Sequence, residues 1–283
     1  MKQLSHFREY GLRPFCDQLN LRFIEVFYGY DPGTWKSSLP HNRLICILES
    51  DGESFFQDAD ETIPLTADTA VLVPAFHEIT HHQNDSMHLL SIHFALELYC
   101  GVDILTQRKH LWQERNPERT LRIRRMTEHP ERLLLTATLR TLCWDAILRS
   151  LDSAPELENH NLLPSYTRYE ALFEFLLHNC HAGIDVGQMA DVLRMNKETF
   201  IKNFIRDTGI PPKQFFNRLL VDRASRLLSG TDRTIREIAL ELEFCNEFYF
   251  SRFFRNHLGI SPREYRKRYQ MNPEKSLLPD SLL

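Results

Sequence analysis

The 283-residue sequence lacks the features that mark membrane-spanning, secreted and metal-stabilised proteins. No stretch approaches the roughly 18 consecutive apolar residues of a transmembrane helix, which excludes that class. The six cysteines are scattered, without a C-x-x-C pair or zinc-finger spacing, so the sequence predicts neither a disulfide framework nor a structural metal. No charged-then-apolar leader opens the chain, and we therefore expect a reduced, cytoplasmic protein without a membrane partner.

A strong charge of one sign is also missing, because the net charge is only −4 at pH 7. The charge is unevenly divided, however. Residues 165–270 carry 17 Lys and Arg against 13 Asp and Glu, so this part is positive by four and the remainder is negative by eight. The basic surplus favours a nucleic-acid partner for the C-terminal part of the chain.

The sequence does contain a helix-turn-helix pattern, and it occurs twice, over Val186–Gly209 and over Ile235–Gly259. Residues of the first unit recur at an offset of 50 in the second: Asn196, Phe200, Lys202 and Phe204 correspond to Asn246, Phe250, Arg252 and Phe254. Two such units in tandem imply a protein that reads DNA sequence.

Local signals specify where these helices begin. Asn196 and Asn246 are good N-caps for the second helix of each unit. Capping-box spacing precedes each first helix and occurs once more after the second unit, where Pro262 suits the first helical position. The three pairs are Asp185 with Gln188, Thr234 with Glu237, and Ser261 with Glu264.

Each second helix has two contrasting faces. At about 100° per residue, Phe200 and Phe204 share one face while Lys202 lies opposite, and the second unit repeats this arrangement around Arg252. The apolar faces seat the helices on the protein, and the opposite faces are free to enter a major groove. The predicted DNA-binding residues are Asn196, Lys197, Glu198, Ile201, Lys202, Arg206, Asn246, Glu247, Phe248, Ser251, Arg252 and Arg255.

Ile201 and Phe248 are the apolar members of this set. An apolar side chain near a base edge can contact a thymine methyl group. Packing against a neighbouring helix or the sugar backbone is the alternative for both residues.

A single helix is predicted between the two units, over Pro211–Ser229, because prolines suit a first turn and apolar residues recur at helical spacing. At about 1.5 Å per residue this helix spans roughly 28 Å. That length approaches the roughly 34 Å between successive major-groove faces. The two units are therefore spaced to enter neighbouring turns of the groove.

Residues 165–266 resemble the DNA-binding domain of the AraC/XylS family of bacterial transcription regulators. The resemblance rests on residues 208–215 (TGIPPKQF), 223–228 (RASRLL), 235–239 (IREIA), 250–255 (FSRFFR) and 259–266 (GISPREYR). It implies double-stranded DNA as a partner, and RNA polymerase as another if the protein is an activator. The family usually has glycine in each turn, where this chain has Arg194 and Glu243, and a left-handed non-glycine residue costs about 1–2 kcal/mol.

The N-terminal half contains short β-rich runs at Arg22–Tyr28, Arg43–Glu49, Thr69–Val73 and Met87–Phe94. Such spacing favours a small β-barrel or sandwich. Residues 70–77 and 91–94 are similar to strands of the sensor domain in the same family, which implies a cupin-like fold. The predicted fold class is α+β: an N-terminal cupin-like β-barrel with a helical segment, then an all-α domain with two helix-turn-helix motifs joined by a long helix.

Polar and aromatic residues of the predicted barrel are candidates for a ligand pocket. They offer histidine nitrogens, a stacking face and a positive charge, which suit a small polar ligand such as a sugar, although ordinary barrel packing is the alternative. The candidates are Tyr28, Trp35, His41, Arg43, His77 and His93. We predict no metal or other cofactor, because Arg43 stands where the family motif has a paired histidine and Ala75 replaces the usual glycine.

A helix with a broad apolar face is predicted over Pro130–Leu151. It can cover the barrel and also pair with a second subunit, or it can pack only within the chain. The predicted divisions are a ligand-sensing domain over 1–128, a helical dimerisation or packing segment over 129–152, a linker over 153–164, a DNA-binding domain over 165–270 and a flexible tail over 271–283.

Together these features predict a dimeric, ligand-controlled transcription regulator that is not an enzyme. One alternative is a metal-dependent cupin-type enzyme with an attached DNA-binding module, in which His41, His77 and His93 are metal ligands. A second alternative is a DNA-binding protein that responds to no ligand.

Overall fold

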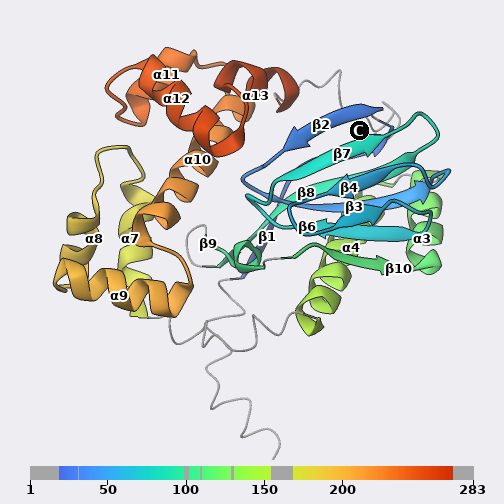
Figure 1. The fold of residues 1–283 in the computed structure, drawn as a ribbon, viewed down its shortest axis with the longest axis horizontal. Helices are drawn as coiled ribbons and strands as arrows, with labels where there is room; N and C mark the ends of the chain where they lie inside the picture. Colours follow the sequence, from blue (N-terminus) through green and yellow to red (C-terminus); the bar gives the residue numbers. More distant parts are fainter. Residues whose placement is uncertain are drawn as a thin grey trace, which may run out of the picture.

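The computed structural model describes residues 19–30, 32–98, 102–108, 110–128, 131–153 and 168–269. Apart from Ser153, the predicted linker over 153–164 and tail over 271–283 fall outside these residues. Figure 1 shows a β-rich part on the right and a helical part at the left and top, with helix α10 running beside the β-rich part.

Two antiparallel sheets form the β-rich part. The larger has the strand order β1-β8-β3-β6-β10, with β9 paired to β8, and the smaller has the order β2-β7-β4-β5. The four predicted β-rich runs correspond to β1, β3, β6 and β8. The strands are β1 Asn20–Gly29, β2 Gly33–Ser37, β3 Asn42–Glu49, β4 Phe55–Gln57, β5 Thr62–Pro64, β6 Thr69–Val73, β7 Ile79–Gln83, β8 His88–Leu98, β9 Val102–Asp103 and β10 Trp112–Arg115; a 3-10 helix, η1, covers Ile104–Gln107.

Strand alternation divides the buried side chains of β3 between two cores. Ile45 and Ile47 pack between the two sheets, with Phe56 and Ile79 of the smaller sheet. Leu44, on the opposite face, packs with helices α3 (Pro117–Glu128) and α4 (Arg132–Asp152). The larger sheet therefore separates a core between the two sheets from a core covered by helices.

Helix α4 confirms the predicted apolar stripe and shows its limits. Leu135, Leu139, Leu142 and Ala146 are buried against the larger sheet. Other leucines of the predicted apolar face are not covered, because Leu134 and Leu148 remain 53% and 60% exposed. One face of α4 covers the barrel, and a second apolar face remains accessible.

Seven helices of the described residues build the C-terminal part around a core rich in phenylalanine. The two helix-turn-helix units lie at the two ends of α10 (Figure 1), and the predicted α+β class is confirmed. The helices are α7 Glu170–His178, α8 Val186–Val192, α9 Lys197–Thr208, α10 Pro212–Gly230, α11 Ile235–Glu241, α12 Glu247–Leu258 and α13 Pro262–Tyr269.

Candidate nucleic-acid interface and ligand site

The predicted caps fix where the helices of both units begin. Asp185 Oδ1 accepts a hydrogen bond from Gln188 N at 2.9 Å, and Gln188 Oε1 accepts one from Asp185 N. The two hydrogen bonds form a capping box. Thr234 and Glu237 form the equivalent box before α11. Asn196 and Asn246 cap α9 and α12, where Asn246 Oδ1 accepts from Tyr249 N at 2.8 Å. Residues next to each helix therefore determine where α9 and α12, the second helices of the two units, begin.

Both turns adopt the left-handed backbone in spite of their non-glycine residues. Arg194 has φ 53° and Glu243 has φ 54°. The Glu243 carboxylate lies 2.7 Å from His181 Nδ1, a contact that glycine would not provide. The turn geometry that glycine usually serves is therefore retained at a cost in local strain.

Helices α9 and α12, the second helices of the two units, present matching faces. Phe200 and Phe204 of α9, and Phe250 and Phe254 of α12, are fully buried. The side chains opposite them reach solvent. Of the predicted DNA-binding residues, nine are exposed and three are half-buried: the exposed ones are Asn196, Lys197, Glu198, Lys202, Arg206, Asn246, Phe248, Arg252 and Arg255, and the half-buried ones are Ile201, Glu247 and Ser251.

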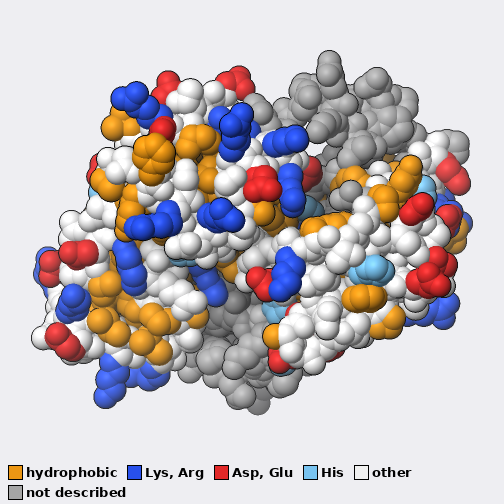
Figure 2. Space-filling view, turned by 45° about the horizontal axis from the view of Figure 1, so that its top comes forward, with side chains coloured by type: hydrophobic (Ala, Val, Ile, Leu, Met, Phe, Trp, Pro, Cys, Tyr) orange, Lys and Arg blue, Asp and Glu red, His pale blue; other side chains and the backbone are white. Residues whose placement is uncertain are grey.

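The two apolar candidates differ in their surroundings. Ile201 packs against the helical core, which favours the packing interpretation for that residue. Phe248 is 79% exposed at the start of α12, so its ring is available to a partner. Arg252 lies over the Tyr249 ring at 5.3 Å, which orients its guanidinium on the same helix. Figure 2 shows further Lys and Arg side chains distributed over the helical part, at the left of the view.

A polar cluster lies between the two sheets of the barrel. Arg43 Nη1 donates to Ser37 Oγ at 2.7 Å and lies 3.1 Å from His81 Nε2. His41 Nε2 and His93 Nδ1 are 3.1 Å apart, and Trp35 stacks on His81 with ring centroids at 4.7 Å. Four of the six predicted ligand residues, Trp35, His41, Arg43 and His93, thus meet in one place.

Burial controls the charge of this cluster. Loss of hydration lowers the pKa of His93 to about 3, and it also lowers the pKa values of His41 and His81. Repulsion from the positive charge of Arg43 lowers all three pKa values further. The same burial lowers the pKa of Arg43 to about 10, so the guanidinium remains protonated at neutral pH. The cluster combines neutral histidines with one buried cation.

The structure places the other two predicted ligand residues elsewhere. Tyr28 lies on the opposite face of β1, against the helix-covered core, because side chains alternate along a strand, and its ring is 5.7 Å from that of His88. His77 follows β6 and its Nε2 is 2.9 Å from Asp58 Oδ2. The structure therefore does not bring Tyr28 and His77 into the polar cluster with the other four candidates.

The cluster also contains residues that the sequence prediction omitted. His81 and Ser37 belong to it, and strand alternation within Ile79–Gln83 was the signal that pointed His81 inward. Tyr269, at the end of α13, has its ring 6.5 Å from that of His41 and 6.4 Å from that of His93. No local pattern links Tyr269 to the barrel, because the contact joins residues far apart in the sequence.

The metal-ligand set of the enzyme alternative does not assemble. His41 and His93 are neighbours, whereas His77 pairs with Asp58. Within the described ranges, no three His, Cys, Asp or Glu side chains gather as a candidate metal site. The same ranges contain no helix long and apolar enough to cross a membrane.

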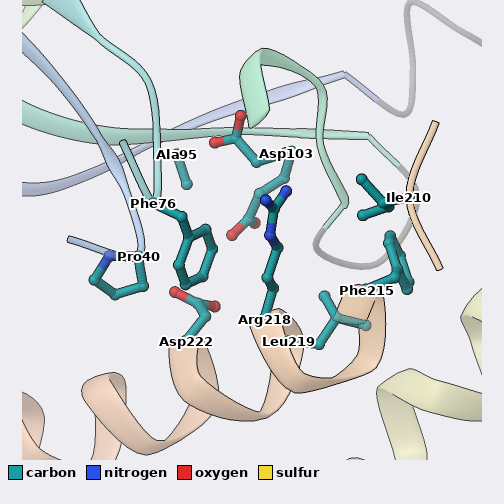
Figure 3. A pocket seen from close by; sticks show the side chains of 10 residues that line it. Pro40, Phe76, Ala95, Asp103, Ile210, Phe215, Arg218, Leu219 and Asp222 are labelled. Carbon is teal, nitrogen blue, oxygen red and sulfur yellow. The ribbon is translucent and has the colours of Figure 1, made fainter. Parts of the chain in front are cut away.

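Helix α10 lies against the barrel along a small cleft, which is lined by side chains of both parts (Figure 3). Arg218 of α10 lies over the Phe76 ring at 5.2 Å, and Arg226 Nη2 is 2.9 Å from Glu97 Oε1. Arg22 Nη2 also contacts Glu97 Oε1, at 2.6 Å. The barrel and the helical part therefore share a charged contact surface.

Comparison with known proteins supports this two-part arrangement. Residues 189–268 match a family model described as a helix-turn-helix domain. The MmsAB operon regulatory protein of Pseudomonas aeruginosa is 27% identical over 99 residues, which cover 35% of this chain and 32% of that protein. The HTH-type transcriptional activator RhaS of Enterobacter sp. (strain 638) is 29% identical over 121 residues, covering 43% of this chain and 42% of that protein. The aligned segments thus span less than half the length of either relative.

The fold is similar over most of the chain to ToxT from Vibrio cholerae O395, with a TM-score of 0.58 and 11% identity, covering 90% of this chain and 100% of that one. At this identity the likeness shows a shared fold. With the sequence relatives, which are named as transcription regulators, it confirms the resemblance: the C-terminal part of this chain contains a helix-turn-helix domain, attached to an N-terminal domain of two antiparallel sheets.

Proposed function

We propose that the protein is a sequence-specific DNA-binding transcription regulator in which α9 and α12 each enter a major groove. The observation that carries this proposal is the repeated recognition helix. Each buries a phenylalanine pair and presents a cation, Lys202 or Arg252, on the opposite, exposed face. Long cationic side chains in such positions contact base edges and phosphates.

The spacing of the two units suits one face of a DNA duplex. Helix α10, with 19 residues, spans roughly 28 Å at about 1.5 Å per residue. Adjacent major-groove segments on one face repeat at roughly 34 Å. We infer that the two recognition helices contact two blocks of sequence about one helical turn apart.

The barrel is the proposed sensor for a small-molecule effector, with a sugar as one candidate class. Its polar cluster supplies hydrogen-bonding nitrogens beside aromatic surfaces, as ligand pockets do. A ligand changes activity only if it binds one arrangement of the two domains better than another. The Glu97 ion pairs to Arg226 and Arg22 lie at the domain contact that such a ligand would alter.

The regulator is proposed to act in the cytoplasm as a homodimer, with RNA polymerase as a further partner if it activates transcription. Helix α4 supports the dimer, because Leu133, Leu134 and Leu148 are exposed on it. A dimer would present four helix-turn-helix units, and the second half-site would then be bound at a raised effective concentration. The predicted division into sensor, helical segment and DNA-binding domain remains part of this proposal.

Selection from a random DNA pool tests the proposal. The full-length protein is incubated with the pool at a fixed salt concentration, and bound sequences are recovered and counted. We expect an enriched motif with two blocks centred about 10 base pairs apart. Recovery of no motif, with binding that depends only on salt, would overturn sequence-specific recognition.

A further inference from the structure

Arg43 is a buried cation whose hydrogen bonds are only partly satisfied. The residue is 3% exposed, and its Nη1 donates to Ser37 Oγ. Its Nε and Nη2 atoms are shielded from solvent and have no hydrogen-bond partner among the described residues. Since each buried donor without an acceptor costs free energy, this edge of the guanidinium is chemically incomplete.

A second buried arginine in the same domain shows the usual solution. Arg119 is 5% exposed, and its Nη2 is 2.6 Å from Glu114 Oε2 and 3.3 Å from Asp145 Oδ2. A buried charge is ordinarily balanced in this way. The Nε and Nη1 atoms of Arg119 also lack a hydrogen-bond partner, so the two buried arginines differ only in that Arg43 has no ion-pair partner among the described residues.

The neighbours of Arg43 do not supply that charge. His41, His81 and His93 are kept neutral by burial. Glu25 lies in the same region, but its Oε2 is 3.5 Å from His93 Nδ1, and within the described residues no ion pair joins it to Arg43. Within the described residues, no carboxylate forms an ion pair with the Arg43 guanidinium, so its positive charge has no balancing anion there.

Resting on the proposed sensor role of the barrel, we propose that the effector is a small carboxylate and that Arg43 binds its carboxylate group through Nε and Nη2. These two nitrogens form the planar fork that matches two carboxylate oxygens. The face of Trp35, stacked on His81, offers an aromatic surface to the body of the ligand. A neutral sugar would satisfy the hydrogen bonds but would leave the positive charge unbalanced.

The site adjoins the DNA-binding domain through one side chain. Tyr269 belongs to α13, the helix that follows the second helix-turn-helix unit, and its ring lies near both His41 and His93. Arg43 and Tyr269 also influence each other electrostatically. Because the free guanidinium edge is closed to solvent, a carboxylate must displace part of its cover, and movement of Tyr269 would carry the signal to α13.

Thermal unfolding of the full-length protein tests the proposal with matched pairs of probes: phenylacetate against phenylacetamide, and glucuronate against glucose. At about ten times the Kd, a bound carboxylate is expected to raise the Tm by about 3–6 °C, and its neutral counterpart by much less. The Arg43→Met variant should lose this response. Lys36→Gln, which removes an exposed charge from neighbouring β2, should keep it.

The Arg43→Met variant also reports on its own folding. Since it removes an unbalanced buried charge, we expect its Tm without ligand to be no lower than that of the wild type. The proposal is overturned if neither carboxylate raises the Tm, if the neutral probes act equally well, or if Arg43→Met keeps the response. Selection of DNA by the same preparation tests the proposed regulator function separately. A DNA-binding protein that responds to no ligand would show no change in Tm with the carboxylates and would still enrich a DNA motif.

Discussion

Arg194 illustrates how a single residue can oppose the geometry of its turn. Its φ of 53° places a side chain where glycine is unstrained. Replacing Arg194 by glycine would relieve about 1–2 kcal/mol of backbone strain. This gain exceeds the roughly 0.5–1 kcal/mol of folding free energy that glycine loses because its unfolded chain is more flexible. We therefore expect Arg194→Gly to raise the free energy of unfolding by about 0.5–1 kcal/mol, measured by urea denaturation. Arg194→Ala is the control, and equal stabilisation by both variants would contradict the strain argument.

Asp103 provides a second test at the scale of one residue. Burial raises the pKa of Asp103 to about 7. The hydrogen bonds that Leu96 N and Leu105 N donate to its carboxylate lower the pKa but do not offset the effect of burial. Because this folded pKa lies above the unfolded value of about 3.9, the folded state binds the proton more tightly, and the contribution of Asp103 to stability falls as pH rises from about 4 to 7.

We expect Asp103→Asn to remove this decline. Between pH 5 and pH 7.5 the wild type should lose on the order of 1–3 kcal/mol of unfolding free energy relative to the variant. Denaturant unfolding of both proteins across that pH range measures the difference. The buried histidines have the opposite effect on stability as pH rises, but both proteins contain them, so their effect cancels in the comparison. Parallel pH profiles would contradict the raised pKa.

At the scale of elements, the recognition helices show what local sequence determines. Their caps, their buried phenylalanine faces and the intervening helix were predictable, since each depends on residues within a few turns of one another. The strands β3 and β6 were predictable for the same reason. The structure shifts the intervening helix by one residue, to Pro212–Gly230, which is within the usual uncertainty of helix ends.

Phe248 of α12 gives a prediction about base recognition. Its exposed ring is expected to cover a thymine methyl group in the selected site. Replacing that thymine by uracil removes the methyl group and should weaken wild-type binding by about 0.8 kcal/mol, or roughly four-fold. The Phe248→Ala variant should bind both DNAs equally, as measured by equilibrium titration. A methyl effect that persists in the variant would assign the contact to another residue.

Helix α4 gives a prediction about assembly. Leu134 and Leu148 are exposed on the face that does not contact the barrel, so their replacement leaves the folded core intact. If this face pairs two subunits, the double variant Leu134→Glu/Leu148→Glu should sediment as a monomer that keeps the circular-dichroism spectrum of the wild type, with a Tm no higher than that of the dimer. The same oligomeric state for wild type and double variant in sedimentation would remove α4 from the interface.

At the scale of the whole molecule, the contacts that unite the two domains join distant residues. Arg226 meets Glu97 across the domain boundary, and Tyr269 meets His41 and His93. Figure 3 shows a further meeting of the two domains, where Phe76 and Asp103 of the barrel part face Arg218 of α10 across the cleft. Sequence periodicity carries no information on such pairs, because they depend on how two separately specified domains dock. For this reason the polar cluster between the sheets was predicted in part and its link to α13 was missed.

The most direct measurement for the whole account is a hydroxyl-radical footprint of the full-length protein on its selected DNA site. We compare the wild type with Lys202→Ala and Arg252→Ala, each expected to lose about 1–3 kcal/mol of binding, and with Arg125→Ala on α3 as a charge-matched control. The account predicts two protected blocks about one helical turn apart, with Lys202→Ala weakening one block and Arg252→Ala the other. Unchanged protection in both variants would contradict the assignment of α9 and α12 as the helices that read DNA.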